Sequence, residues 1–135
     1  MRTSDNNDSG KLEGFYQVEE GAFRWTKRQF AITFDLPDAP AGGQVRMELE
    51  IYLSDPLMQN LAPIRLAGRI GNHLLDPEAF GQSGKFIYAR DLPGAWFKIG
   101  PNRIEFDVDK ALPPSAADGR ELGIVVKHAS LKRRD

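Results

Sequence analysis

The stretch Gln44–Leu53 reads Gln-Val-Arg-Met-Glu-Leu-Glu-Ile-Tyr-Leu and alternates between polar and apolar side chains over its whole length. Every odd-numbered position from Val45 to Leu53 is apolar, and every position between them carries a charged residue or tyrosine. A period of two places one face against a core and the other in water, which is the pattern of a long, half-buried β-strand. A helix would scatter the same apolar residues around its axis, so this stretch predicts a strand.

The same alternation recurs in three other segments, at residues 30–36, 64–70 and 104–108. Shorter strand-like segments occur at 14–19, 22–26, 73–75, 84–92 and 122–131, and turns rich in proline and glycine separate them. Regular strand and turn spacing is typical of an antiparallel sandwich or barrel. We therefore expect an all-β fold of about eight or nine strands, with less than about a tenth of the residues in helix.

The apolar positions of the four alternating segments predict the core. Their fifteen side chains are Phe30, Ile32, Phe34, Leu36, Val45, Met47, Leu49, Ile51, Leu53, Ile64, Leu66, Ile70, Ile104, Phe106 and Val108. Burial of each contributes about 1.5–3 kcal/mol before chain ordering is counted. This core needs neither a disulfide nor a metal.

Connections between the strands carry their own signals. Asp55 and Pro56 begin what we interpret as an irregular connection through Asn60, and residues 76–82 are compatible with one helical turn. Gly71-Asn72 predicts the turn of a β-hairpin, and Gly68, inside a strand, indicates a bulge or a close backbone approach. Residues 84–92 are apolar at both odd and even positions, so we expect this strand to be covered on both faces.

The chain has 135 residues, the length of one domain. We expect a disordered polar tail or linker at 1–13, a single β-sandwich domain at 14–131 and a charged tail at 132–135. A formal net charge of −1 argues against recruitment by nucleic acid, and no apolar run is long enough for membrane insertion. The absence of cysteine and of a signal peptide favours a cytoplasmic location.

Two segments resemble the galactose-binding-like jelly-roll domains. These are Leu66-Ala-Gly-Arg-Ile-Gly-Asn-His-Leu-Leu75 and Gly100-Pro-Asn-Arg-Ile-Glu-Phe106. That family carries a hairpin with an Asn/Gly turn and, later, a Gly-x-Asn-x-Ile pattern that enters a strand. The resemblance implies a jelly-roll β-sandwich.

The ends of the chain resemble a small β-sandwich module that is appended to bacterial glycosyltransferases and polysaccharide-processing proteins. The residues concerned are Gly14-Phe-Tyr16, Phe23-Arg-Trp-Thr26 and Asp118-Gly-Arg-Glu-Leu-Gly-Ile-Val-Val126. The resemblance spans roughly residues 14–131. It implies a non-catalytic domain that works beside a carbohydrate-active partner, and it supplies neither a ligand nor a site.

Aromatic side chains are the first candidates for sugar binding, because an exposed indole stacks on the C–H face of a sugar ring. Trp96 follows the turn at Pro93-Gly94, where we expect it to be exposed and to carry glycan binding. Trp25 lies inside a strand, and a core aromatic is the favoured explanation for it, with sugar binding as the alternative. Tyr52 lies on the polar face of its strand and would extend a binding platform, although surface tyrosines need no ligand.

Arginines are the second set of candidates. Planar hydrogen-bond donors that suit hydroxyl groups are present in Arg24, Arg65, Arg69, Arg90 and Arg103, of which we select Arg24, Arg90 and Arg103 as candidate binding residues. Cross-strand ion pairs with surface carboxylates (Glu48, Glu50, Glu105 and Asp107) explain these arginines more simply. Asp107 and Asp109 lie two positions apart and would ligate calcium with a third aspartate, Asp91 or Asp118. Calcium needs six to eight oxygen ligands and no compact acidic loop supplies them, so we expect neither a metal nor a cofactor.

No motif predicts catalysis, because His73 and His128 lie in no known catalytic or metal-binding spacing. The favoured hypothesis is a non-catalytic carbohydrate-binding or polysaccharide-associated accessory module, whose partner is a glycan or a carbohydrate-active protein. The alternative is a structural module that docks a catalytic domain or forms a homodimer through an exposed strand edge. A small glycan-active enzyme is the third hypothesis, which we do not favour.

Overall fold

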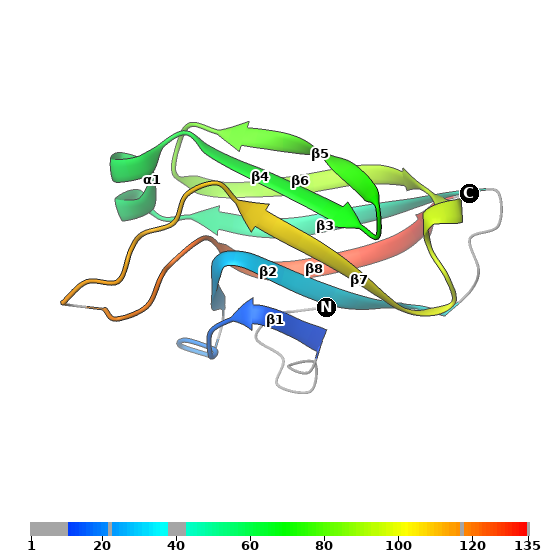
Figure 1. Cartoon of the computed structure of the whole chain (residues 1–135), viewed down its shortest axis with the longest axis horizontal. Helices are drawn as coiled ribbons and strands as arrows, with labels where there is room; N and C mark the ends of the chain where they lie inside the picture. Colours follow the sequence, from blue (N-terminus) through cyan, green and yellow to red (C-terminus); the bar gives the residue numbers. More distant parts are fainter. Residues whose placement is uncertain (1–10, 22, 38–42, 117, 135) are drawn as a thin grey trace.

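The computed structural model describes residues 11–21, 23–37, 43–116 and 118–134, and within them it has eight β-strands and one α-helix (Figure 1). All strand pairings are antiparallel, which confirms the predicted β-sandwich. The elements are β1 (Leu12–Phe15), β2 (Arg24–Leu36), β3 (Gln44–Leu53), α1 (Asp55–Leu61), β4 (Ile64–Ile70), β5 (His73–Phe80), β6 (Gly84–Pro93), β7 (Gly100–Val108) and β8 (Val125–Arg134).

The strands form two layers that share β2 (Figure 1). One layer, which we call the five-stranded layer, has the order β5-β4-β7-β2-β1. The other, the three-stranded layer, consists of β8, β3 and β6. Arg24 and Trp25 at the start of β2 pair with β8, whereas residues 29–36 of the same strand pair with β7. β2 therefore connects the layers on one side of the sandwich.

The core lies between the two layers and is built from the alternating apolar residues. The odd-numbered residues of β3 are at most 1% exposed, because β3 is central in its layer, between β8 and β6. All fifteen side chains predicted to point inward are buried, including Leu49 and Phe106. The strand faces predicted from the period of two are thus confirmed.

On the opposite side of the sandwich, side chains of β6 hold the two edge strands β5 and β6 together. The Tyr88 hydroxyl donates a hydrogen bond to the Asp76 carbonyl over 2.7 Å, and Arg90 Nε donates to the same oxygen over 2.8 Å. The Arg90 guanidinium also lies 4.3 Å from the centroid of the Tyr88 ring. Burial raises the pKa of the Tyr88 hydroxyl. These contacts close the core at β5 and β6, between which the described residues form no backbone ladder.

The predicted hairpin and bulge are both confirmed. Gly71 and Asn72 form the turn between β4 and β5, which pair from Ile70 and His73 outward. The register of that pair shifts between Leu66 and Gly68. A Cβ atom at Gly68 would lie 3.0 Å from the Phe106 ring, so a glycine here lets the ring fill the core.

The connection after β3 is helical, and the predicted irregular structure is wrong. Helix α1 begins where Ser54 Oγ accepts a hydrogen bond from the Leu57 amide over 3.3 Å. Pro56 lies in the first turn, where its missing N–H group is not needed. Leu57 and Met58 are buried under the sandwich core, which anchors this short helix.

Two other local predictions are also wrong. The expected helical turn at 76–82 is absent, since β5 continues to Phe80 and residues 78–80 pair with residues 64–66 of β4. The strand at 84–92 is not covered on both faces. β6 is the edge strand of its layer, and Ile87 on its outer face is 62% exposed.

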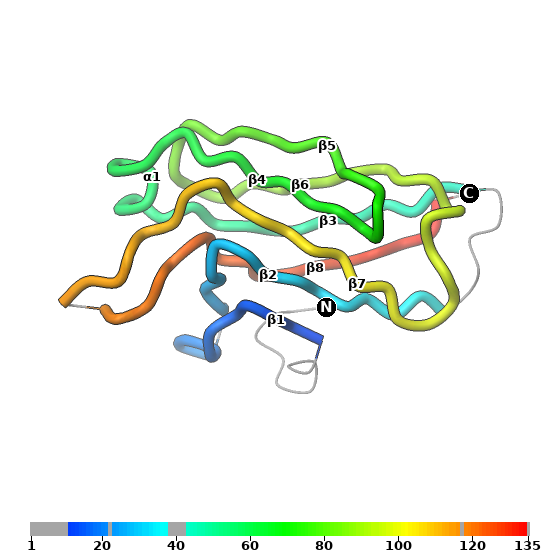
Figure 2. Tube along the Cα trace, in the orientation of Figure 1, coloured from blue at the N-terminus to red at the C-terminus, as the bar shows by residue number. Residues whose placement is uncertain are grey.

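A long connection joins β7 to β8, and Figure 2 traces it away from the strands and back. Mutual backbone hydrogen bonds of 2.8 and 2.9 Å between Leu112 and Leu122 hold its two arms together. β8 then runs to Arg134, so the charged residues 132–134 lie in a strand. At the other end β1 begins at Leu12, and residues 1–10 of the expected tail lie outside the described residues.

Candidate functional site

A hollow of about 570 Å³ lies on the outer face of the five-stranded layer, and we call it the sheet hollow. Its lining includes residues from all five strands of that layer. The polar lining residues alternate in sequence with core residues such as Phe30, Ile104 and Phe106, so their side chains project away from the core. The period of two that builds the core therefore also builds this surface.

Small side chains form the floor of the sheet hollow. Strand register places Ala31 opposite Glu105 and Ala67 opposite Asp107. Each alanine methyl leaves space that the longer side chains around it enclose. Beneath the floor the rings of Phe30 and Phe106 stack at 5.3 Å with an interplanar angle of 21°. A packed core thus supports the floor from below.

Ion pairs form one wall of the sheet hollow and link three strands. Arg103 Nε contacts Glu13 Oε2 on β1 at 2.7 Å, and its Nη1 contacts Glu105 on β7. Arg69 Nε on β4 contacts the other oxygen of Glu105 at 2.6 Å. The hydrogen bond from Arg103 holds the pKa of Glu13 below its ordinary value. Hydrogen bonds from Arg103 and then Arg69 lower the pKa of Glu105. Both arginines are therefore engaged by carboxylates.

We expect acid to destabilise the fold through these carboxyl groups. Their folded-state pKa values lie below the ordinary 4.5 of glutamate, so the unfolded chain binds more protons as the pH falls. The two carboxylates contribute fully to the stability of the fold at a pH above 4.5. This contribution is lost as the pH falls through their lowered pKa values in the folded protein. The melting temperature should therefore stay level from about pH 7 to pH 5 and fall below about pH 4.5.

The Glu105→Gln variant tests this expectation, because its melting temperature should fall less steeply with acid than that of the wild type. Glu50→Gln is the matched control. Glu50 is exposed on the three-stranded layer and has no ion pair among the residues that the structure describes. Equal acid slopes for the wild type and Glu105→Gln would contradict a role for the wall.

Opposite this wall two polar side chains are uncommitted. Gln29 on β2 and Asp107 on β7 are direct cross-strand partners. Within the described part of the chain neither side chain has a hydrogen-bond or ion-pair partner. A carboxylate accepts hydrogen bonds, and an amide both donates and accepts them. Leu74, 75% exposed, adds apolar surface at the β5 rim. This arrangement suits a ligand with hydroxyl groups and some apolar surface.

Six residues were predicted from the sequence to bind sugar, and one of them, Arg103, lines the sheet hollow. Trp96 lies elsewhere, in a 3-10 turn after β6. It is half-buried against the core, and its indole stacks on the His73 ring at 4.3 Å with an interplanar angle of 6°. The histidine thus covers one face of the indole, and a role for Trp96 in binding stays a prediction.

Trp25 and Arg24 belong to a cluster that we call the N-terminal clasp. Trp25 is half-buried, and its Nε1 donates to Glu19 over 2.7 Å. Arg120, from the connection before β8, donates to the other Glu19 oxygen over 2.9 Å and lies 5.2 Å from the Tyr16 ring centroid. Arg24, 8% exposed, donates to the Tyr16 carbonyl. The clasp joins the segment before and at the start of β2 to the connection before β8, and these contacts favour a structural role.

Arg90 and Tyr52 complete the six. The Arg90 guanidinium is engaged by the carbonyls of Asp76 and Pro77 on β5 and by Glu78, so its donors are used within the fold. Tyr52 is half-buried on β3, at a position between the core residues Ile51 and Leu53. It therefore belongs to the outer face of the three-stranded layer, the other side of the sandwich from the hollow.

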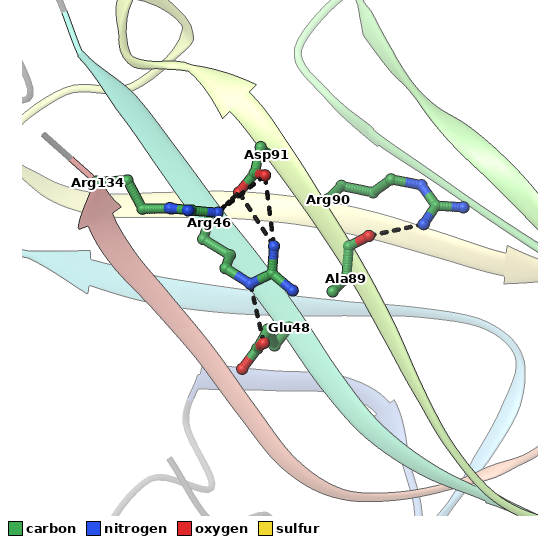
Figure 3. A network of polar contacts seen from close by, with 6 residues as sticks. All are labelled: Arg46, Glu48, Ala89, Arg90, Asp91 and Arg134. Atoms are coloured by element: carbon green, nitrogen blue, oxygen red, sulfur yellow. Dashed lines mark hydrogen bonds and ion pairs between the residues drawn. The ribbon is translucent and has the colours of Figure 1, made fainter.

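That outer face carries its own ion-pair network (Figure 3). Arg46 Nε contacts Glu48 at 3.0 Å and its Nη1 contacts Asp91 at 3.3 Å. Arg134 Nη1 contacts Asp91 at 3.0 Å, and the hydrogen bond from Arg134, then that from Arg46, lowers the pKa of Asp91. The pairs connect β8, β3 and β6, and they anchor the end of the last strand.

The aspartates considered for calcium lie in different places. Asp91 is held by these arginines, Asp107 lines the sheet hollow, and Asp118 is held by Arg120. Asp109 accepts a hydrogen bond from the Arg65 amide over 2.8 Å. Within residues 11–21, 23–37, 43–116 and 118–134 no three metal-binding side chains form a group.

The two histidines lie on different layers, His73 on β5 and His128 on β8. No helix in the described residues has the length and apolar character needed to cross a membrane.

Sequence reasoning did not single out Gln29, Ala31, Ala67 or Leu74, and it considered Asp107 as a calcium ligand or a surface charge. One signal was available. Ala31 and Ala67 occupy outward positions of strands whose other outward residues are longer, so the surface is lower at these two positions.

No protein-family model matches the chain, and no curated protein matches its sequence. Solved structures share its fold. The C-terminal CBM6 module of the laminarinase LamC from Zobellia galactanivorans has a TM-score of 0.50 and 10% identity, with 90% of each chain covered. A family 35 carbohydrate-binding module from Clostridium thermocellum has a TM-score of 0.51 and 10% identity, with 89% of this chain and 88% of that chain covered. These likenesses show the fold: it is that of known carbohydrate-binding modules.

Proposed function

We propose that this domain is a non-catalytic carbohydrate-binding module and that it binds glycan in the sheet hollow. The observation that carries the proposal is the pairing of Asp107 with Gln29 across two strands, both uncommitted, beside the alanine floor. A concave surface with a few convergent polar groups is the general form of a small-ligand site, and polar groups without a partner suit hydroxyl groups. The fold shared with two carbohydrate-binding modules supports the same function.

The proposed site binds through hydrogen bonds and not through a stacked aromatic ring. Phe30 and Phe106 line the hollow only as the buried layer under its floor, at 4% and 2% exposure. Leu74 is the exposed apolar side chain there and would contact the C–H face of a sugar. We therefore expect modest affinity for a single sugar and higher affinity for an oligosaccharide that spans several strands.

The domain would act as an accessory to a carbohydrate-active protein, bringing it to its polysaccharide. This part of the proposal rests on the resemblance of both chain ends to modules of glycosyltransferases and polysaccharide-processing proteins. Glu19, Trp25 and Arg120, which lie in or beside those segments, meet in the N-terminal clasp.

Filling the hollow tests the proposal. In Ala67→Trp an indole would occupy the floor without entering the core, because residue 67 projects outward between Leu66 and Gly68. We expect the variant to lose the glycan retention that the wild type shows on a glycan array, with its melting temperature nearly unchanged. Ala89→Trp is the control, since Ala89 lies outside the hollow on β6. Retention that persists in Ala67→Trp would place the glycan elsewhere.

A docking role is the second candidate, and exposed apolar residues favour it. Ile87 is 62% exposed on the edge strand β6 and Ile99 is 61% exposed before β7. Exposed apolar side chains on a sheet edge are common features of protein contacts. In that case the array would show no retention, and the wild type would associate with itself or with a catalytic domain instead.

A further inference from the structure

The charges around the sheet hollow determine which glycans it accepts. Arg69 and Arg103 are the cations of the lining, against the carboxylates of Glu13, Glu105 and Asp107. These two cations and three carboxylates give the lining a formal charge of −1. The excess negative charge lies at Asp107, beside Gln29. Glu13 and Glu105 are already engaged by the arginines, whereas Asp107 has no cationic partner among the described residues.

Carboxylates already balance the charge of both arginines. Arg69 Nε lies 2.6 Å from Glu105, and Arg103 bridges Glu13 and Glu105. An incoming carboxylate or sulfate at the outer nitrogens of Arg69 would lie beside Glu105 and would also approach Asp107, so like charge on both sides opposes its binding. Two other cations, Lys27 and Arg65, lie two positions along β2 and β4 from Gln29 and Ala67, outside the lining.

We propose that the sheet hollow selects uncharged glycans and rejects acidic ones, with adjacent sugar hydroxyls bridging Asp107 and Gln29. This inference rests on the proposed function of the same site. A hydroxyl donates to the Asp107 carboxylate, a hydrogen bond strengthened by the charge, while the Gln29 amide donates to or accepts from the neighbouring hydroxyl. A uronate carboxylate in that position donates nothing and meets like charge.

The experiment compares matched ligands on one array. Neutral β-1,4-glucan and β-1,4-xylan oligosaccharides identify a ligand that the wild-type domain retains. The acidic form of a glucan ligand has its C6 hydroxymethyl groups oxidised to carboxylates, and the acidic form of a xylan ligand carries glucuronate branches. A third form has the same carboxylates converted to methyl esters. We expect the acidic form to bind about tenfold more weakly and the ester, which has no charge, to recover most of the loss. An acidic form that binds as well as the neutral one would overturn the inference. So would an ester that stays as weak as the acid.

A charge-reversing variant supplies the second arm. Glu105→Gln with Asp107→Asn changes the formal charge of the lining from −1 to +1 and frees Arg69. It should bind the acidic form better than the neutral one, and an unchanged preference would contradict the charge argument. Failure of the proposed function looks different, because then the wild type retains none of the ligands, or retains them equally after Ala67→Trp.

Discussion

Phe106→Ala will lower the free energy of unfolding by about 3–5 kcal/mol, the usual cost of removing a buried phenylalanine. Phe106 is 2% exposed at the middle of β7. Its ring stacks on Phe30 and occupies the space that a side chain at residue 68 would take. Because residue 68 is a glycine, it has no side chain that can fill the cavity left by the truncation. Urea unfolding of the two proteins measures the difference.

The same substitution also tests the support of the sheet hollow, because Phe106 lies directly under its floor. Ile99→Ala is the control. Ile99 is 61% exposed, and its truncation should change stability by less than about 0.5 kcal/mol. A loss below that same value in Phe106→Ala would mean that β7 presents its other face to the core.

Asp107→Ala will weaken binding of a neutral oligosaccharide by about 10- to 100-fold and leave the melting temperature nearly unchanged. A hydrogen bond to a charged group contributes about 1.5–3 kcal/mol, which corresponds to this loss. The fold does not depend on this carboxylate, since it has no partner in the described structure. Calorimetric titration with the oligosaccharide retained on the array gives the affinity.

Two further variants bracket that result. Gln29→Ala removes a neutral amide and should cost only about 2- to 10-fold. Glu50→Ala removes a carboxylate from the opposite layer and should cost nothing. Equal affinities for Asp107→Ala and the wild type would contradict the role of Asp107.

The fold was predictable because its main signal is local. A strict period of two in β3 and in the inward residues of β2, β4 and β7 assigns each side chain to a face without knowledge of its partners. Two of the wrong predictions fall where a neighbouring strand decides the structure. Residues 76–82 have turn-forming and helix-compatible residues, yet pairing with β4 extends them into β5. The exposure of Ile87 follows from the edge position of β6, which no local pattern reveals.

The candidate site was less predictable because it depends on register between strands far apart in sequence. Gln29 and Asp107 become partners only when β2 pairs with β7, and Ala67 joins them through β4. Trp25 and Trp96 were the first candidates from the sequence, but their contacts with Glu19 and His73 join segments that lie apart in the chain. Arg103 is the one residue of the six candidates that lines the sheet hollow, and there carboxylates engage its guanidinium group.

The most direct test is a titration of the ¹⁵N-labelled domain with the retained neutral oligosaccharide, followed through its backbone amide shifts. Binding in the sheet hollow predicts that the largest changes occur at Gln29, Ala67 and Asp107, on three neighbouring strands of the five-stranded layer. Changes centred instead on Trp96 and His73, with those three amides unmoved, would contradict this account and return the site to the turn after β6.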